Sequence, residues 1–308
     1  MRTKFKSSIR AACSSFRRAA CAGAVILICT NAQAQDLFVA SVSSGNIFEI
    51  TPGGAQSAFA SGLNQPFGLA FNSSGDLFAA NNFANTITEI TPGGVQSTFA
   101  SGLNRPADLA FDSAGNLFVA DLNSGNIVEF TPGGVQSIFA SGLNRPADLA
   151  FDSSGNLYEA DDGSGNINKF TPAGLQSTFA SGLNGPEGLA FNSAGNLFVA
   201  DLNGGNIVEF TTGGSQSTFA SGLIFPNFPY EIAFNSAGDL FASSFPQGAI
   251  YEFTPGGVQS TFATDVGGPG LAFQGVTLPV PEPSVLGLLA VGATALLVHS
   301  CRRKRLST

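Results

Sequence analysis

Hydrophobic and polar residues follow one another in short runs along most of this chain, and the same order of runs returns about every 40 residues. The third copy, residues 116–155, reads NLFVADLNSGNIVEFTPGGVQSIFASGLNRPADLAFDSSG. Val, Ile and Phe dominate four short runs within it, as is typical of half-buried β-strands. We predict strands at 116–120, 126–130, 135–140 and 147–151.

Turn-forming sequences separate the four runs and argue against a helical repeat. In the third copy these sequences are LNSG, TPGG, SGLNRP and DSSG. Gly permits positive φ there, and Pro presets φ for a turn. Because such breakers recur along the whole copy, no 3.6-residue period survives between them.

Six copies of the unit follow one another, and their number predicts the fold. The first four are 40 residues long, the fifth has three residues more, and the sixth has three fewer. Four strands in about 40 residues match a propeller blade better than a coil of a parallel β-solenoid, which is usually shorter. We predict an all-β, six-bladed β-propeller of four-stranded antiparallel blades over residues 36–275. The copies begin at Asp36, Asp76, Asn116, Asn156, Asn196 and Asp239.

The phase of the repeat predicts how the ring closes. If the run before DSSG is the innermost strand, the chain enters at Asp36 with a second strand and finishes at 271–273 with an innermost strand. That last strand then completes the blade begun by residues 36–60, which removes an exposed sheet edge. The turns DSSG and TPGG fall on one face together with both ends of the domain, and the longer loops fall on the other.

The sequence PADLAFDSAGNLFVAD, from Pro106 to Asp121, resembles NHL-type repeats. It is also similar to the related gluconolactonase-like and streptogramin-lyase-like six-bladed propellers. The resemblance covers all of residues 36–275. It implies the fold, but a propeller hosts many functions, so chemistry has to be argued from particular residues.

Residues 1–34 are typical of a secretory signal peptide. Six basic residues precede an apolar run at 19–29, and small residues stand before a predicted cleavage site after Ala34. An uncleaved anchor is the alternative, but the apolar run is short for one. We therefore predict that the protein is exported.

The C-terminal segment resembles the PEP-CTERM sorting signal of Gram-negative bacteria. A Pro-rich linker with the PEP motif, 276–284, precedes a predicted transient transmembrane segment and basic tail, 285–305. The apolar run of this tail, 285–298, is shorter than the roughly 20 residues of a stable transmembrane helix. An ordinary single-span anchor is the alternative. The residues that carry the resemblance are Pro281, Glu282, Pro283, Arg302 and Arg303.

The resemblance to this sorting signal implies recognition by an exosortase. It also implies transient anchoring in the inner membrane and a final location in the cell envelope, on the outer surface or outside the cell. The basic tail would stay cytoplasmic and the propeller would lie outside. Contact with the membrane is expected only through the C-terminal tail.

Composition excludes several kinds of chemistry from the predicted propeller. All four cysteines and the single histidine, His299, lie outside residues 36–275. The domain therefore has no disulfide, no thiol nucleophile, no histidine base and no histidine or thiolate metal ligand. This counts against streptogramin-lyase-like chemistry, which the resemblance ties to a histidine.

Charge excludes another class of partner. The predicted propeller carries 20 acidic and three basic residues, a net charge of −17. Nucleic-acid binding is not expected, because contacts to phosphates need a basic surface.

The copies differ near the start of the innermost strand, where three of them carry an acidic residue. These residues are Asp108, Asp148 and Glu231, and they could converge near the mouth of the channel. Carboxylates are hard ligands that suit Ca²⁺. The resemblance to gluconolactonases also implies a divalent metal held in this region by Glu, Asn and Asp. A Ca²⁺ site is one prediction, and a polar rim filled by water is the alternative.

The fifth copy is three residues longer than the first four, and the extra length falls within residues 224–230. This segment predicts a loop on the longer-loop face. Exposed aromatic residues there could contact a partner or a glycan. Alternatively, the loop folds back to plug the channel or to cover a blade. The residues of the predicted contact are Phe225, Phe228 and Tyr230.

These observations favour a non-enzymatic interaction or scaffold module, because near-identical copies do not place distinct catalytic groups in one site. No catalytic residue and no cofactor is assigned in this interpretation. The sorting signal implies a link to exopolysaccharide or biofilm matrix, with the exosortase and an extracellular polysaccharide or envelope protein as partners. The alternative is a metal-dependent lactonase or related hydrolase, with Asp108, Asp148 and Glu231 holding the metal at the channel mouth.

Overall fold

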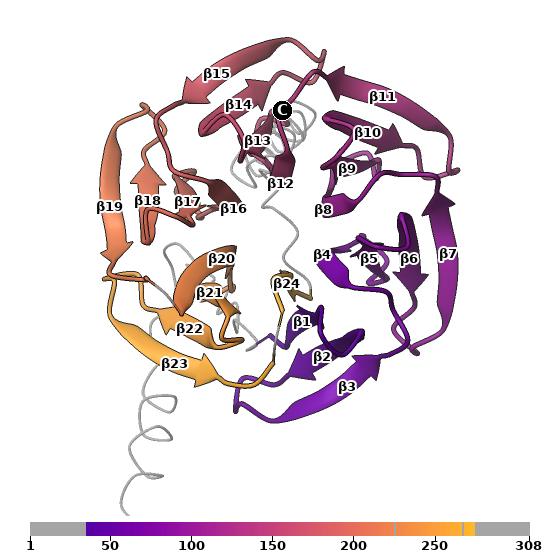
Figure 1. Cartoon of the computed structure of the whole chain (residues 1–308), viewed down its shortest axis with the longest axis horizontal. Coiled ribbons are helices and arrows are strands. Elements are labelled where there is room, and N and C mark those ends of the chain that lie inside the picture. The colour runs from indigo at the N-terminus through magenta and orange to yellow at the C-terminus, as the bar shows by residue number, and fades with distance from the viewer. Residues whose placement is uncertain (1–34, 225, 267, 275–308) are drawn as a thin grey trace, which may run out of the picture. The chain divides into compact units, whose positions relative to one another are not determined.

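The computed structural model describes residues 35–224, 226–266 and 268–274, and each regular element in these ranges is a β-strand. The strands form six four-stranded antiparallel sheets, which are arranged as blades in a ring around a central axis (Figure 1). This confirms the predicted six-bladed propeller. In the part of the chain so described, no helix is long and apolar enough to cross a membrane.

Each blade is named here from its innermost strand, at the channel, to its outermost strand, at the rim (Figure 1). Blade 1 contains β24 (Leu271–Phe273), β1 (Leu37–Ser41), β2 (Asn46–Ile50) and β3 (Gln56–Ala60). Blade 2 contains β4 (Pro66–Phe71), β5 (Leu77–Asn81), β6 (Thr86–Ile90) and β7 (Gln96–Ser101). Blade 3 contains β8 (Pro106–Phe111), β9 (Leu117–Asp121), β10 (Asn126–Phe130) and β11 (Gln136–Ser141).

Blades 4 to 6 repeat this order. Blade 4 contains β12 (Pro146–Phe151), β13 (Leu157–Asp161), β14 (Asn166–Phe170) and β15 (Gln176–Ala180). Blade 5 contains β16 (Pro186–Phe191), β17 (Leu197–Asp201), β18 (Asn206–Phe210) and β19 (Gln216–Ser221). Blade 6 contains β20 (Asn227–Phe234), β21 (Leu240–Pro246), β22 (Ile250–Phe253) and β23 (Gln259–Ala263).

The last strand closes the ring as the phase of the repeat predicts. β24 pairs antiparallel with β1, with Leu271 opposite Val39 and Phe273 opposite Leu37. Beyond the paired strands, the Gln35 Nε2 donates a hydrogen bond of 2.7 Å to the backbone oxygen of Gln274. Blade 1 is therefore built from both ends of the described chain.

The DSSG and TPGG turns lie on one face of the ring, called the tight-turn face, and the LNSG and SGLNRP connections lie on the opposite face, called the longer-loop face. In blade 3 the connections are short on both faces, at 112–116 and 131–135 on the first and at 122–125 and 142–145 on the second. In the TPGG turn of blade 3, the Gly134 N–H donates to the Thr131 oxygen at 2.8 Å, with Gly134 at a φ of 78°. Positive φ at this position explains why each copy carries Gly there. Because β1 begins and β24 ends on the tight-turn face, both ends of the described domain lie on that face, as predicted.

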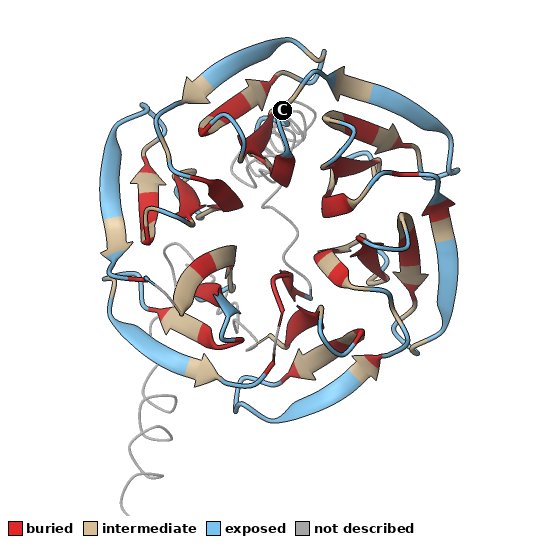
Figure 2. Ribbon diagram, viewed as in Figure 1, coloured by how far each residue is buried: buried red, intermediate tan, exposed pale blue. Residues whose placement is uncertain are grey.

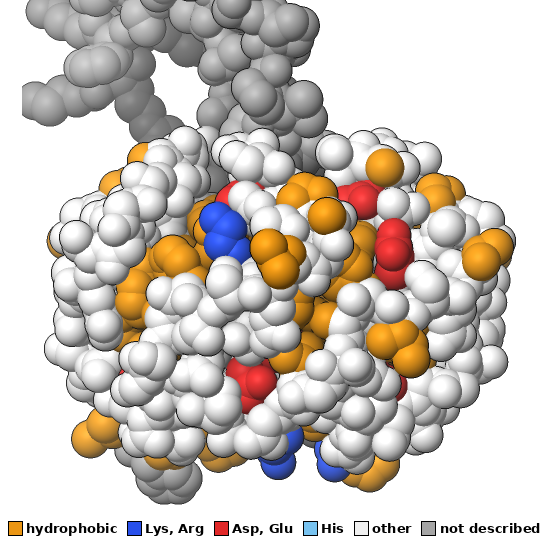
Figure 3. All heavy atoms as spheres, turned by 90° about the horizontal axis from the view of Figure 1, so that it is seen from above, with side chains coloured by type: hydrophobic (Ala, Val, Ile, Leu, Met, Phe, Trp, Pro, Cys, Tyr) orange, Lys and Arg blue, Asp and Glu red, His pale blue; other side chains and the backbone are white. Residues whose placement is uncertain are grey.

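The core lies between neighbouring blades and is built from repeated phenylalanines. In blade 3, the Phe118 ring packs edge-to-face on Phe139 and Phe151, at centroid distances of 5.0 and 5.1 Å. Such pairs add about 0.5–1.5 kcal/mol beyond the burial of the rings. Inner strands are accordingly buried, whereas the outermost strands are largely exposed (Figure 2). Seen edge-on, uncharged polar side chains and backbone cover most of the rim in view (Figure 3).

Candidate metal site in the channel

Three carboxylates meet in the channel, each from the innermost strand of a different blade. Asp108 lies on β8, Asp148 on β12 and Glu231 on β20. Each offers one oxygen atom, and these three oxygens lie within 4.8 Å of one another. The structure thus brings together the three residues that differ between the copies, while metal binding itself stays a prediction.

A β-bulge near the start of these strands directs the aspartates into the channel. The pairing register shifts between Pro106 and Asp108 on β8, and between Pro146 and Asp148 on β12. Bulges commonly turn a side chain away from the regular alternation of a strand. Because both strands begin on the longer-loop face, the carboxylates lie near the mouth of the channel on that face.

Glycines occupy the three equivalent positions of the remaining blades, at Gly68, Gly188 and Gly270. A Cβ atom at Gly188 would lie 2.7 Å from the backbone oxygen of Tyr230 and 2.9 Å from the Cα of Glu231. Real Cβ atoms do not approach other atoms so closely, so the neighbouring strand can pack there only against Gly. Three glycines therefore let the channel narrow around the three carboxylates.

Backbone donors of the next blade hold the aspartates in place. The Leu149 N–H donates to Asp108 Oδ2 at 3.1 Å and to Asp148 Oδ1 at 2.6 Å. The Leu189 N–H donates in turn to Asp148 Oδ2. The two aspartates therefore link blades 3, 4 and 5, and their side chains are held in place before any ligand binds.

Electrostatics make this cluster chemically unusual. Burial is the main cause that raises the pKa of Asp108, and it raises the pKa values of Asp148 and Glu231 well above their ordinary range. Neighbouring negative charge raises the latter two further, with Asp108 contributing to both. Carboxylates this close cannot all be ionised unless a cation joins them, so the cluster holds either protons or a cation.

Two further groups line the same small pocket, Glu187 and Tyr230. Burial raises the pKa of Glu187 to about 8, and a hydrogen bond with Tyr230 opposes that rise. The Tyr230 ring packs on Phe67 and Phe245, at centroid distances of 6.2 and 5.8 Å. An acid that keeps its proton at neutral pH thus stands beside the carboxylates, next to an aromatic wall.

Sequence reasoning did not assign Glu187 to the site, although a signal for it exists. Glu187 and Tyr230 occupy equivalent positions of blades 5 and 6, directly before the position of the carboxylates. The other blades carry uncharged residues there that lack a hydroxyl group. These residues are Phe67, Ala107, Ala147 and Pro269.

The aromatic residues of the predicted partner contact are placed differently from the prediction. Residues from Asn227 onward form β20 instead of a loop, because β20 is longer than the equivalent strands and pairs Phe228 with Phe245. Phe228 and Tyr230 are partly buried, so they are not the exposed aromatics that a loop would present. Tyr230 lines the channel pocket instead. Phe225 lies outside the described residues.

The predicted sorting segments also lie outside the described residues. These are the signal peptide with cleavage after Ala34, the linker at 276–284 and the tail at 285–305. The structure therefore does not test them.

The donor set fits a hard divalent cation. Ca²⁺ takes oxygen ligands at about 2.3–2.6 Å, so two ligands of one ion lie no more than about 5 Å apart. The separation of up to 4.8 Å among the three oxygens meets that limit. The pocket that Asp148 and Glu231 line has about 10 Å³ for water-sized molecules, enough for roughly one. The residues present therefore fit one Ca²⁺ ion or a similar cation.

Comparison with known proteins supports the fold. No family model and no curated protein matches the sequence. Among solved structures, a gluconolactonase from Xanthomonas campestris is 17% identical with a TM-score of 0.64, covering 77% of this chain and 87% of that one. A nidogen/laminin complex gives 19% identity and a TM-score of 0.71, covering 78% of this chain and 98% of that one.

A third similar structure is virginiamycin B lyase from Staphylococcus aureus, in a catalytically inactive histidine-to-alanine form with quinupristin. It is 17% identical with a TM-score of 0.60, covering 80% of this chain and 94% of that one. The predicted resemblance to gluconolactonase-like and lyase-like propellers is thus confirmed at the level of the fold.

The same comparison corrects the functional prediction. A non-enzymatic interaction or scaffold module was expected because the copies are nearly identical, but streptogramin lyases and gluconolactonases share this fold and are enzymes. The expectation that a propeller of this kind is not an enzyme is therefore overturned. The error has a physical reason: a ring needs only one differing residue in each of a few blades to gather distinct groups at its axis.

Proposed function

We propose that this propeller is a metal-dependent lactonase or a related hydrolase. Asp108, Asp148 and Glu231 would hold the metal. The observation that carries the proposal is the convergence of these three carboxylates, from three blades, to within 4.8 Å. Residues 40 or more positions apart along the chain supply them, so local turn formation does not explain their meeting.

The residues around the carboxylates suit the hydrolysis of a small ester. When bound, a divalent cation would polarise the carbonyl group of the substrate or lower the pKa of a water molecule. Without a bound cation, burial raises the pKa of Glu187 to about 8, and this carboxyl group could give its proton to a leaving oxygen. The rings of Phe67 and Tyr230 would exclude water from one side.

A lactonase is favoured over a lyase by what the chain lacks. The lyase structure with quinupristin is inactive when one histidine is replaced by alanine. The only histidine of this chain is His299, which lies beyond the propeller. The carboxylates, in contrast, are the type of ligand that a Ca²⁺-dependent site needs.

The test measures metal binding and turnover on the purified protein. After chelation and addition of Ca²⁺, we expect about one bound ion, a higher melting temperature and hydrolysis of D-glucono-1,5-lactone. Asp148→Asn removes one carboxylate ligand and keeps the shape of the side chain, so the variant should still fold but lose both the calcium-dependent shift and the activity. Glu129→Gln, a carboxylate change outside the channel, is the matched control and should keep both.

Two results would overturn the proposal. One is a protein that shows no calcium-dependent shift in melting temperature and no turnover of lactones or esters. The other is Asp148→Asn protein that binds the ion and hydrolyses the lactone as the wild type does.

We further propose export of the protein and sorting through its C-terminal signal. The proposal is supported by the order of PEP motif, apolar run and basic cluster. Because both described ends lie on the tight-turn face, the channel mouth would point away from the point of attachment. Mass spectrometry of the protein from a Gram-negative host with an exosortase should find cleavage near Pro281 to Pro283. An uncleaved C-terminus in that host, with Arg302 and Arg303 retained, would contradict it.

A further inference from the structure

A second pocket opens on the tight-turn face, between blades 4 and 5, opposite to the channel mouth. Its volume is about 320 Å³, near the lower end of the roughly 300–1,000 Å³ of small-molecule sites. Turn residues at 152–154, 192–195 and 211–212 form its rim, and Phe179, Phe191 and Phe210 are among its walls. It is thus a mixed polar and aromatic pocket large enough for one small ligand.

Three residues of this pocket depart from the repeat, and each introduces a polar group. Tyr158 stands where the other five copies carry Phe, Lys169 stands where they carry Glu, and Thr212 stands where they carry Pro. All three line the same pocket, although they come from β13, β14 and the turn after β18. The equivalent residues are Phe38, Phe78, Phe118, Phe198, Phe241, Glu49, Glu89, Glu129, Glu209, Glu252, Pro52, Pro92, Pro132, Pro172 and Pro255.

The repeat itself shows that these departures are not needed for folding. In blade 5 the residue equivalent to Lys169 is Glu209, which accepts a hydrogen bond of 2.7 Å from Asn196 Nδ2 within its own blade. The same blade architecture therefore forms with Glu at that position. Lys169 reverses the charge there, and it is one of only three basic residues in the propeller.

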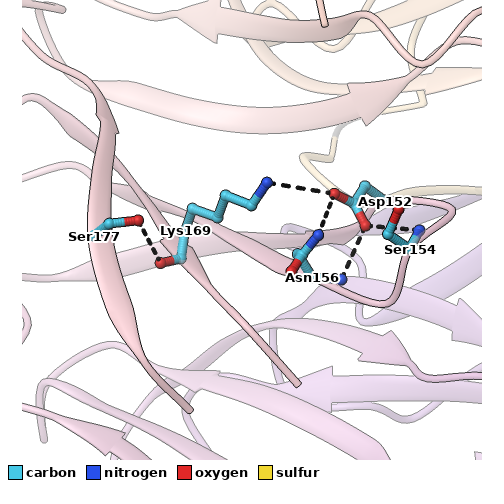
Figure 4. Close-up of polar contacts among 5 residues, drawn as sticks. All are labelled: Asp152, Ser154, Asn156, Lys169 and Ser177. Carbon is cyan, nitrogen blue, oxygen red and sulfur yellow. Dashed lines mark hydrogen bonds and ion pairs between the residues drawn. The ribbon is translucent and has the colours of Figure 1, made fainter. Parts of the chain in front are cut away.

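The Lys169 ammonium is positioned at the pocket and retains donors for a ligand. Its Nζ lies 3.7 Å from Asp152 Oδ2, a long ion pair (Figure 4). The same nitrogen lies 5.0 Å from the centre of the Tyr158 ring. Hydrogen bonding with Tyr158 is the main cause that raises the pKa of Lys169, so the group stays charged. A lysine has three donors, and Asp152 and Tyr158 together engage at most two of them, so one is left for a ligand.

Asp152 is held in place by three hydrogen bonds, and only its Oδ2 keeps a lone pair that a ligand hydroxyl group could use beside Lys169. Its Oδ1 accepts the Ser154 and Asn156 N–H groups at 2.9 Å each, and its Oδ2 accepts Asn156 Nδ2 at 2.8 Å (Figure 4). The pocket thus contains a fixed carboxylate, an ammonium group, the hydroxyl groups of a tyrosine and a threonine, and aromatic walls. These groups complement a ligand that has both an anionic end and hydroxyl groups.

We propose that this pocket binds a small polyhydroxylated carboxylate, a sugar acid, with its carboxylate on Lys169. Its hydroxyl groups would bond with Asp152, Tyr158 and Thr212. A phosphate is disfavoured, because its second charge would face Asp152 with only one lysine to balance both. The inference is independent of the proposed lactonase function, because the two pockets lie on opposite faces.

The test titrates the purified protein with D-glucuronate by calorimetry, with D-glucose as the neutral analogue of the same ring. We expect saturable binding of glucuronate and at least tenfold weaker binding of glucose. Lys169→Glu should weaken glucuronate binding at least tenfold, because it restores the residue of the other five copies. Tyr158→Phe and Thr212→Pro also restore repeat residues, and each should weaken binding two- to tenfold.

A charge-matched control separates a local site from the net charge of the protein. Lys169→Glu combined with Glu129→Lys keeps the net charge but moves the lysine to blade 3, and it should bind as weakly as Lys169→Glu alone. The proposal is overturned if glucuronate does not bind at tens of millimolar, or if Lys169→Glu protein with a native circular-dichroism spectrum binds it unchanged. Equal binding of glucose or of inorganic phosphate would also overturn it.

Discussion

Glu159, on β13, is a fully buried carboxyl group that has only one hydrogen-bond donor in the described part of the molecule. Asn168 Nδ2 donates to its Oε2 at 2.9 Å, whereas its Oε1 has no hydrogen-bond partner there. Burial raises the pKa of Glu159 to about 8. Blades 3 and 5 carry two valines at these positions, so blade 4 has a polar pair where an apolar pair suffices.

Replacing this pair by the residues of blades 3 and 5 should stabilise the protein. A buried polar pair exchanged for well-packed apolar residues often stabilises by about 1–4 kcal/mol. We expect Glu159→Val combined with Asn168→Val to raise the free energy of unfolding at pH 7 within that range, measured by denaturant titration. Asn168→Val alone should lower it, because Glu159 then loses its only donor.

The pH dependence of stability identifies Glu159 as the cause. The unfolded chain releases this proton near 4.5, whereas the folded protein keeps it to about 8. The folded state thus binds more protons between these values, and the free energy of unfolding falls as the pH rises from about 4.5 to about 8. The double variant should lose part of this slope, and the remainder stays because burial also raises the pKa values of Glu187, Asp148 and Glu231 in the channel. An unchanged slope would contradict the assignment.

At the scale of strands, the repeat predicts nearly the whole fold. The run predicted at 126–130 is β10 with the same bounds, and the run predicted at 147–151 is part of β12. This works because Gly and Pro mark each turn, so the strand ends have little freedom. The prediction was wrong at Asn227–Tyr230, where a strand replaces a loop, since the length of an insertion does not reveal whether it extends the neighbouring strand.

The candidate site was predictable only in part, for a related reason. Differences between copies identify Asp108, Asp148 and Glu231, because equivalent positions of a ring meet at its axis. The same comparison contains Lys169 and Tyr158, but their meeting with Thr212 depends on how two blades pack. That packing is set by side-chain contacts between blades, which no pattern within one copy specifies.

At the scale of the whole molecule, stability depends on one strand that no turn connects to its neighbour. In blades 2 to 6, a tight turn joins the innermost strand to the second strand, whereas β24 and β1 come from opposite ends of the described chain. Losing β24 from the ring therefore needs no other blade to unfold. Closing so long a loop also costs entropy, which only the contacts of β24 offset.

Truncation of the side chains on β24 should open the ring locally. Leu271 and Phe273 are buried and pack with Leu37 and Val39 of β1. Each change to Ala costs roughly 2–5 kcal/mol in a core. In Leu271→Ala combined with Phe273→Ala, we expect the β1 amides to exchange hydrogen faster than those of the other second strands, measured by native-state hydrogen exchange.

The matched control makes the same change in a blade that is continuous in sequence. Leu69→Ala combined with Phe71→Ala alters the equivalent positions of β4, but the turn at 72–76 keeps β4 beside β5. Detachment of β4 from β5 is then opposed by a short connection, so the β5 amides should exchange mainly through global unfolding. The β1 amides and the β5 amides could instead exchange at the same rate in their respective variants. In that case β24 holds its blade together as firmly as a strand joined by a turn does, and the ring has no preferred opening point.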